Sequence, residues 1–250
     1  MNSRFELYLG DCMEIMQKIP EYSIDLILCD LPYGITANKW DAVLDLTLLW
    51  TEYERVLKPH GVVVLFASQP FTTSVISSNK TLFKYVWYWE KNRATGHLSA
   101  QKQPMRKIED LCVFYKAPCL YQPQMSIGKP YSHSGGKNHN GTTYGARSIQ
   151  KQSIENKGTR YPTNILNFDT VGQKGRNHPS EKPVDLLLYL IKTYTKEHDT
   201  ILDNCMGSGS TGVAAASSSR KFIGIELDEE FFNIARQRII KSFEDSMPPL

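Results

Sequence analysis

Two kinds of hydrophobic pattern alternate along this chain. Short continuous apolar runs are typical of strands that a parallel sheet buries on both faces. Apolar residues repeated every three or four positions are typical of amphipathic helices. We expect strands at 5–9, 24–30, 62–66, 85–90, 110–115, 200–204 and 221–226, and helices at 11–19, 44–57, 183–194, 213–216 and 229–242. Strands alternating with helices predict a doubly wound, mostly parallel α/β sheet, as in Rossmann-like folds.

The pattern nearly disappears between residues 117 and 176. This segment is rich in Gly, Ser, Asn and Lys and shows no sustained periodicity. A loop-rich segment of such length is more often functional than structural. We therefore expect one domain in two halves, 1–116 and 177–250, separated by an insertion at 117–176 that is the candidate target-recognition region.

Positive charge gathers in the middle of the chain, although the net charge of the whole is only +3. Between residues 91 and 176 the acids are few, whereas Lys and Arg are frequent. Clustered basic residues favour a nucleic-acid surface, although a solvated loop would show the same pattern. The candidate phosphate contacts are Lys91, Arg93, Lys129, Lys137, Arg147, Lys151 and Arg160.

The five cysteines show neither a C-x-x-C pair nor the spacing of a zinc site, so we expect buried free thiols and no metal. His133 and His139 lack a cysteine or carboxylate partner at ligand spacing. No apolar run approaches the length of a membrane span, and the N-terminus does not resemble a signal peptide. These features predict a cytoplasmic protein.

The first motif with chemical content is Asp30-Leu31-Pro32-Tyr33-Gly34, directly after the apolar run 24–29. A buried strand would deliver a carboxylate acceptor and an aromatic face to one point. Amino-group chemistry on a planar nucleobase needs both. The alternative interpretation is that Asp30 caps a turn or helix and that Tyr33 is a core aromatic.

The second motif follows the strand 200–204, where Gly207, Gly209 and Gly212 precede a helical segment. A strand, a glycine turn and a helix are typical of nucleotide-cofactor sites, because glycine allows a tight turn and close backbone approach to a ligand. The spacing matches neither the dinucleotide fingerprint nor the phosphate loop. Glu226 ends the next strand, where an acid typically accepts hydrogen bonds from ribose hydroxyls. A simple tight connection is the alternative.

Together these motifs resemble the S-adenosylmethionine-dependent DNA amino-methyltransferases of the permuted class, in which a D-P-P-Y-type motif precedes the glycine motif. The resemblance covers most of the chain in one consistent order: Gly10-Asp11-Cys12, Asp30–Tyr33, His178–Pro183, Asp203–Gly209 and Glu226. Leu31 departs from the commoner proline, and Asn204-Cys205-Met206 departs from the usual lead into the glycine turn. Both departures are compatible with positions that act through their backbone.

The resemblance implies a role for each motif. The carboxylate of Asp30 and the carbonyl of Leu31 would accept the amine hydrogens, and Tyr33, held in the turn with Pro32, would stack on a flipped base. Cofactor contacts would come from Asp11 and Cys12 at adenine, Ser180 and Lys182 at the methionine carboxylate, Glu226 at ribose, and a loop formed by Asp203, Gly207, Ser208, Gly209 and Thr211. Lys182 facing solvent is the alternative.

The implied reaction is methyl transfer from S-adenosylmethionine to the N6 of adenine in double-stranded DNA, because aspartate heads the first motif. Cytosine N4, RNA, protein glutamine and a non-catalytic DNA-binding role remain alternatives. The resemblance also raises a homodimer and a cognate restriction enzyme as partners, which no feature of the sequence establishes. Trp87, Trp89 and His97 would either line the rim of the base pocket or, for the two tryptophans, pack in the sheet.

Overall fold

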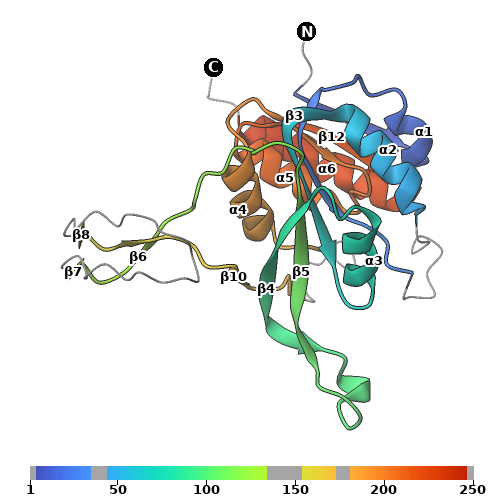
Figure 1. The fold of residues 1–250 in the computed structure, drawn as a ribbon. Helices are drawn as coiled ribbons and strands as arrows, with labels where there is room; N and C mark the ends of the chain where they lie inside the picture. Colours follow the sequence, from blue (N-terminus) through green and yellow to red (C-terminus); the bar gives the residue numbers. More distant parts are fainter. Residues whose placement is uncertain (1–3, 35–43, 134–153, 173–180, 247–250) are drawn as a thin grey trace. The chain divides into compact units, whose positions relative to one another are not determined.

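The computed structural model describes residues 4–34, 44–133, 154–172 and 181–246. Ser180, Lys137, Arg147, Lys151 and His139 lie outside these ranges. The chain divides into two compact units, one formed by Met1–Gln122 with Asn164–Leu250 and the other by Pro123–Thr163. Figure 1 shows the elements of both.

An eight-stranded sheet forms the centre of the first unit, in the order β1-β12-β11-β2-β3-β5-β4-β10. Its strands are β1 (Phe5–Leu9), β2 (Ile24–Asp30), β3 (Leu57–Ala67), β4 (Phe83–Thr95), β5 (Arg106–Phe114), β10 (Ile165–Phe168), β11 (Thr200–Asp203) and β12 (Lys221–Glu226). Only β5 runs antiparallel to its neighbours in this sheet. The prediction of a mostly parallel α/β sheet is confirmed.

Helices cover both faces of this sheet, which explains why its central strands read as unbroken apolar runs. Along β2, Leu26 and Leu28 pack toward one face, and Ile27 and Cys29 pack toward the other. The first face is covered by α4 (Val184–Tyr194), α5 (Ser210–Ser217) and α6 (Glu229–Asp245), and the second by α1 (Cys12–Met16), α2 (Leu46–Val56) and α3 (Phe71–Ser78). None of the helices in the described part of the chain is both long and apolar enough to cross a membrane.

The strand β3 begins earlier than the sequence pattern indicates. The expected helix at 44–57 was to stop at Lys58-Pro59-His60-Gly61, before a strand at 62–66. Instead α2 ends at Val56, and β3 starts at Leu57 and is irregular where it pairs with Ile24 and Leu26 of β2. The polar start of β3 is held by an ion pair of 2.7 Å between Lys58 Nζ and Asp25 Oδ2.

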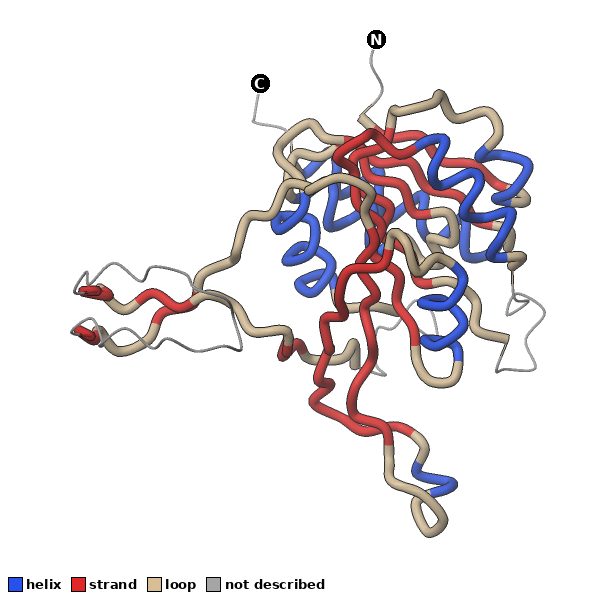
Figure 2. Tube along the Cα trace, viewed as in Figure 1, coloured by secondary structure: helices blue, strands red, loops and turns tan. Residues whose placement is uncertain are grey.

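The strands β4 and β5 form a long antiparallel hairpin that extends past the sheet (Figure 2). Both strands are longer than the expected 85–90 and 110–115, and a short 3-10 turn, His97–Ser99, lies at the tip of the hairpin. The sequence pattern predicted β4 and β5 too short because the outer parts of both strands carry polar residues. Pairing between the two backbones holds these residues extended.

The second unit contains two small antiparallel pairs. They join β6 (Ser126–Ile127) to β9 (Thr159–Arg160) and β7 (Tyr131–His133) to β8 (Ile154–Asn156). This unit is shorter than the insertion expected at 117–176, because β10 at Ile165–Phe168 belongs to the main sheet beside β4. Four residues of β10 are too few to stand out in a polar stretch.

Candidate functional site

The two main motifs meet where the sheet changes its direction of winding. The parallel strands β2 and β11 are neighbours, with Leu26 opposite Ile201. From β2 the chain continues to β3 on one side, and from β11 it continues to β12 on the other. Open α/β sheets bind ligands outside the carboxyl ends of strands at such a switch point. Asp30 ends β2 and Asp203 ends β11, so both motifs open onto this point.

Asp30 is held by one donor on each carboxylate oxygen. The hydroxyl of Tyr33 donates to Oδ1 over 2.8 Å, and Nζ of Lys182 lies 2.7 Å from Oδ2. The Asp30 side chain remains 23% exposed, which leaves it open to a ligand. Leu31 is buried at 3% exposure, and a role for its backbone carbonyl stays a prediction. The alternative that Asp30 caps a helix is wrong, because its side chain faces Tyr33 and Lys182.

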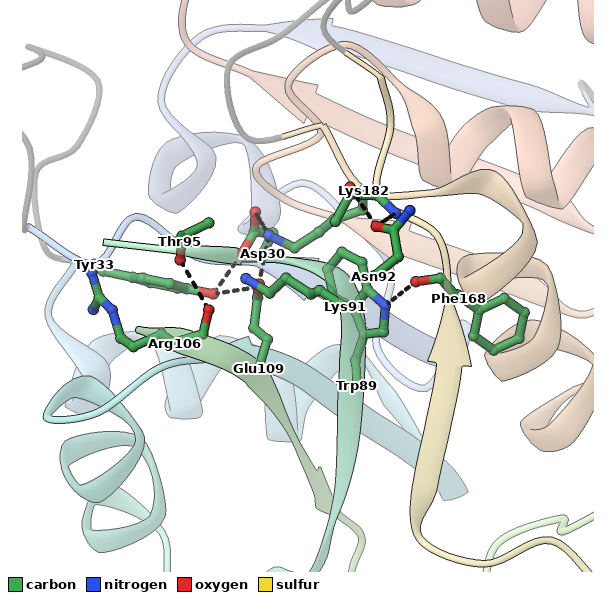
Figure 3. A network of polar contacts seen from close by, with 11 residues as sticks. Asp30, Tyr33, Trp89, Lys91, Asn92, Thr95, Arg106, Glu109, Phe168 and Lys182 are labelled. Carbon is green, nitrogen blue, oxygen red and sulfur yellow. Dashed lines mark hydrogen bonds and ion pairs between the residues drawn. The ribbon is translucent and has the colours of Figure 1, made fainter. Parts of the chain in front are cut away.

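Glu109 completes this cluster, and sequence reasoning missed it (Figure 3). Its carboxylate is almost fully buried and pairs with two ammonium groups, Lys91 at 2.8 Å and Lys182 at 2.9 Å. It also accepts a longer hydrogen bond of 3.3 Å from the Tyr33 hydroxyl. One acidic residue just before the apolar run 111–114 of β5 was the only signal, and it did not identify partners on other strands.

The cluster contains two carboxylates and two ammonium groups, and their pKa values follow from this balance. Burial raises the pKa of Asp30; Glu109 adds to the rise, whereas Lys182 and Tyr33 oppose it. Burial would also raise the pKa of Glu109, but Lys182 and Lys91 outweigh it and lower that pKa to about 2. Burial works against a charged Lys182, yet Asp30 and Glu109 raise its pKa above the ordinary value. The surroundings therefore shift the pKa values of the two carboxylates in opposite directions, that of Asp30 upward and that of Glu109 downward.

The position of Lys182 differs from what the sequence suggested. We expected its ammonium either at the methionine carboxylate of the cofactor or in solvent. The side chain is only 11% exposed and bridges Asp30 and Glu109. The alternative that Lys182 faces solvent is wrong, because its ammonium pairs with two carboxylates. A contact with the methionine carboxylate of the cofactor stays a prediction.

The residue before Lys182 ties the same segment to the glycine turn. Glu181 Oε1 lies 2.7 Å from Arg238 Nη2, and Arg238 Nη1 donates to the carbonyl of Ser208 over 2.6 Å. The hydroxyl of Ser210 donates to Glu181 as well, over 3.3 Å. Consecutive residues of one motif thus contact the glycine turn and the candidate catalytic carboxylate.

Tyr33 packs against the protein on one side. Its ring stacks on Phe71, with centroids 5.0 Å apart and planes 28° from parallel. Burial and the Asp30 charge raise the pKa of Tyr33, which keeps its hydroxyl protonated as a donor. The ring therefore has a protein-packed side and a hydroxyl fixed to Asp30, and stacking on a base stays a prediction.

The glycine turn is shaped by left-handed backbone and by close packing on α6. Gly207 and Gly209 have φ of 51° and 80°. A Cβ on Gly209 would lie 2.9 Å from Cβ of Ala235, so no larger residue fits without movement. Glycine is thus required at position 209 because the backbone of the turn lies close to α6 there.

Glu226 fastens this turn at the end of β12. Its Oε2 accepts from the backbone N–H of Gly207 over 2.8 Å, and Oε1 accepts from Asp228 over 2.9 Å. Burial raises the pKa of Glu226, and these N–H donors oppose the rise. Each carboxylate oxygen accepts two hydrogen bonds, so capacity remains for ribose hydroxyls.

The other candidate cofactor residues that the structure describes differ in exposure: Asp11 is exposed, whereas the rest are buried. Asp11 caps α1 by accepting from the N–H of Met13 over 2.7 Å. Cys12 is buried beside Asn204, whose Nδ2 lies 3.8 Å from its Sγ. Asp203 is 3% exposed, and burial raises its pKa to about 7. Ser208 and Thr211 are buried behind the turn, so their side chains support the loop.

Of the predicted phosphate contacts that the structure describes, two are engaged elsewhere. Lys91 is 14% exposed and paired with Glu109. Arg160 donates to Asn156 Oδ1 and to the carbonyl of Lys129 within the second unit. Lys91 and Arg160 thus make internal contacts, whereas Arg93 and Lys129 are exposed, and phosphate contacts by all four residues stay predictions.

The two tryptophans of β4 pack in the sheet, as the sequence favoured. Trp87 and Trp89 are each 3% exposed. The Nε1 of Trp87 donates to Tyr194, and the Nε1 of Trp89 donates to the carbonyl of Phe168. Neither ring lines the rim of the site. Within the residues that the structure describes, no three His, Cys, Asp or Glu side chains are grouped to bind a metal ion.

Comparisons with known proteins agree with this geometry. A family model described as DNA methylase, N6_N4_Mtase, matches residues 24–237. The chain is 30% identical to the putative methylase YubD of Escherichia coli (strain K12), over 92% of this chain and 88% of that protein. It is 27% identical to the DNA adenine methyltransferase YhdJ of the same strain, over 92% and 81%. The solved M1.HpyAVI–SAM complex shares the fold, with a TM-score of 0.64 and 22% identity over 94% of this chain and 98% of that chain.

Proposed function

This chain belongs to the N6_N4_Mtase family of DNA methylases, and from that premise we propose that it methylates the N6 of adenine in double-stranded DNA, using S-adenosylmethionine. The observation that carries the proposal is the position of Asp30. Its partly exposed carboxylate ends β2 at the switch point, beside the glycine turn, and a buried cluster holds it from behind.

The cofactor fits the chemistry of the residues present. A glycine turn and a helix start follow β11, and the buried carboxylate of Glu226 ends the neighbouring β12. Glu226 would hold the ribose while it keeps its two backbone N–H donors. S-adenosylmethionine supplies a methyl group on a sulfonium, which leaves a neutral thioether when the methyl group departs.

Asp30 and Leu31 would prepare the amine. The exocyclic nitrogen is a poor nucleophile because its lone pair is delocalised into the ring. The Asp30 carboxylate and the Leu31 carbonyl accept its two hydrogens and favour a tetrahedral geometry that frees the pair. Bound S-adenosylmethionine would supply the methyl group, with the N–C bond formed as the S–C bond breaks, and the surplus amine proton would leave to solvent. Positioning supplies most of the rate in such a step.

Lys182, Glu109 and Lys91 would keep Asp30 oriented during this step. Each oxygen of Asp30 can accept a further hydrogen bond, so the amine does not have to displace Tyr33 or Lys182. The two ammonium groups and two carboxylates sum to zero charge. The positive charge that develops on the amine would therefore lie beside Asp30, in a cluster whose net charge is zero.

The proposal includes flipping of the target base out of the duplex, so that its amine can reach Asp30. Unstacking costs a few kcal/mol, and an aromatic–base stack contributes about 1–3 kcal/mol. Tyr33 would supply that stack through its ring, and other contacts to the DNA would supply the remainder. The family covers N6 and N4 methylation, and cytosine N4 chemistry would use the same acceptors; aspartate at the head of the motif favours adenine.

The substrate class is tested by competition. Transfer of label from methyl-labelled S-adenosylmethionine to unmethylated genomic DNA is measured with unlabelled duplex DNA or structured RNA added in excess. We expect duplex DNA to suppress labelling and RNA to leave it unchanged. Suppression by RNA alone would contradict DNA as the substrate.

A further inference from the structure

The outer part of the β4–β5 hairpin, residues 92–107, forms an arm beyond the candidate site. The two strands pair from Glu90 opposite Ile108 to Thr95 opposite Arg106, with an irregularity between. Figures 1 and 2 show the arm extending past the sheet and ending in the short turn at His97–Ser99. Nothing in the reaction at Asp30 requires a projection of this length.

The arm carries positive charge without internal compensation. Residues 92–107 contain no Asp or Glu, and Arg93, Lys102 and Arg106 are exposed. Lys107 pairs with Glu90 at 2.7 Å. The other three basic residues form no ion pair with any residue that the structure describes, so their charge is available to a partner.

The arm begins at the wall of the candidate site. Lys91 and Glu109, which pair with each other behind Asp30, are the residues from which the two arm strands leave (Figure 3). Thr95 lies four positions beyond Lys91, about 13 Å at the rise of a strand. A partner on the arm would therefore lie beside whatever base is bound at Asp30.

The tip adds apolar surface to this charge. Leu98 is 92% exposed and Met105 is 47% exposed. Beside unpaired basic residues, such side chains could contact apolar groups in a DNA groove, such as the methyl group of thymine.

We propose that the arm binds the DNA duplex next to the target base, with Arg93, Lys102 and Arg106 at backbone phosphates and Leu98 in a groove. The proposal rests on the proposed function. A two-stranded ribbon fits the major groove of B-DNA, which is about 12 Å wide. Charge complementarity favours the duplex, because DNA presents a phosphate about every 1.7 Å along its axis.

Two matched triple variants test the arm. Arg93→Gln, Lys102→Gln and Arg106→Gln remove three charges from it, and Lys18→Gln, Arg236→Gln and Lys241→Gln remove three exposed charges elsewhere. Duplex binding is measured by fluorescence anisotropy at several salt concentrations, without methyl donor. We expect the arm variant to lose at least tenfold in affinity and its salt slope to fall by about 0.9 per lost phosphate contact, while the control changes less than threefold.

Equal losses in the two triple variants would overturn the arm proposal, as would a wild-type protein that does not bind duplex DNA. Leu98→Ser provides a second test in which no charge changes. We expect it to lower duplex affinity and to leave sedimentation of the free protein unchanged. A change in sedimentation with unchanged duplex affinity would instead make the arm a surface for a second copy of this chain, and loss of binding to structured RNA alone would make it an RNA surface.

The two proposals fail separately. Duplex binding that depends on the arm, without methyl transfer by the wild type, would contradict the proposed function and leave the arm as a DNA surface. Methyl transfer to DNA that is equally efficient in both triple variants would contradict the arm alone.

Discussion

Lys182 Nζ lies 2.7 Å from Asp30 Oδ2, although 152 positions separate the two residues in the sequence. This contact joins the start of the final third of the chain to the end of β2. It fixes the candidate catalytic carboxylate from the side of the cofactor motif, while Glu109 holds the same ammonium from the side of β5. Catalysis by Asp30 would therefore depend on charges from three separate segments.

The acid limb of the pH–rate profile should report the pKa of Asp30. Asp30 must be ionised to accept the amine hydrogen, and burial raises its pKa above the ordinary value of about 3.9. The rate constant kcat/KM should therefore fall as the pH is lowered through that raised pKa.

Substitution of the two neighbours should move this limb in opposite directions. Glu109→Gln removes a like charge and should shift the limb to lower pH, whereas Lys182→Met removes an opposing charge and should shift it to higher pH. Nearby charges change a pKa by about 1–3 units. Glu90→Gln is the control and should shift nothing, because Glu90 directly precedes Lys91 on β4 but pairs with Lys107 and not with the cluster. Shifts of the same sign in both variants would refute the assigned balance.

Asp30→Asn should remove turnover and leave cofactor affinity nearly intact. The amide keeps the size of the side chain, but it replaces an acceptor oxygen by a donor NH₂ that faces Lys182. We expect kcat to fall by at least about 100-fold, the lower range for loss of a side chain that engages a hydrogen of the reacting group. Stopped-flow or filter assays give kcat, and calorimetry gives the affinity for S-adenosylmethionine. Retained turnover would exclude Asp30 from the chemistry.

Glu226→Ala should weaken binding of S-adenosylmethionine by roughly 10- to 100-fold, because hydrogen bonds to a charged group contribute about 1.5–3 kcal/mol. Glu229→Ala, an exposed acid at the start of α6, is the control. The Glu226 variant should also unfold more readily, since the N–H groups of Gly207 and Asp228 lose their acceptor. Lower stability with unchanged affinity would confine Glu226 to holding the loop.

Three glycine-to-alanine variants separate backbone strain from steric conflict. Gly209→Ala meets both a positive φ and Ala235 at 2.9 Å, and should lower the free energy of unfolding by about 2–4 kcal/mol. Gly96→Ala meets only a positive φ, with a cost of about 1 kcal/mol. Gly172→Ala meets neither and should change stability by less than about 0.5 kcal/mol. Urea unfolding gives the order, and a harmless Gly209→Ala would contradict the packing on α6.

The sequence predicted the parts of the fold that depend on local pattern. Apolar runs located the buried strands and placed both main motifs after strands, but they did not predict that β2 and β11 are neighbours. The pattern was less informative where polar residues extend a strand, as at the start of β3 and along the arm. Backbone pairing between strands decides where these strands begin and end, and the residue types at those positions do not indicate that pairing.

The partners of the charged residues could not be read in the same way. Glu109 and Lys91 lie on paired strands whose register is a tertiary property, and Lys182 reaches them from the far end of the chain. A buried charge takes the partner that the fold brings near. For this reason the residue types of the site were predictable, whereas the contacts of Lys182 and Lys91 were not.

The most direct test of the central claim identifies the methylated base. The purified chain is incubated with methyl-labelled S-adenosylmethionine and unmethylated genomic DNA, which is then digested to nucleosides for mass spectrometry. We predict label in N6-methyladenine for the wild type and none for Asp30→Asn. Label in N4-methylcytosine would overturn the choice of base, and absence of label in DNA, with the cofactor demonstrably bound, would contradict the account.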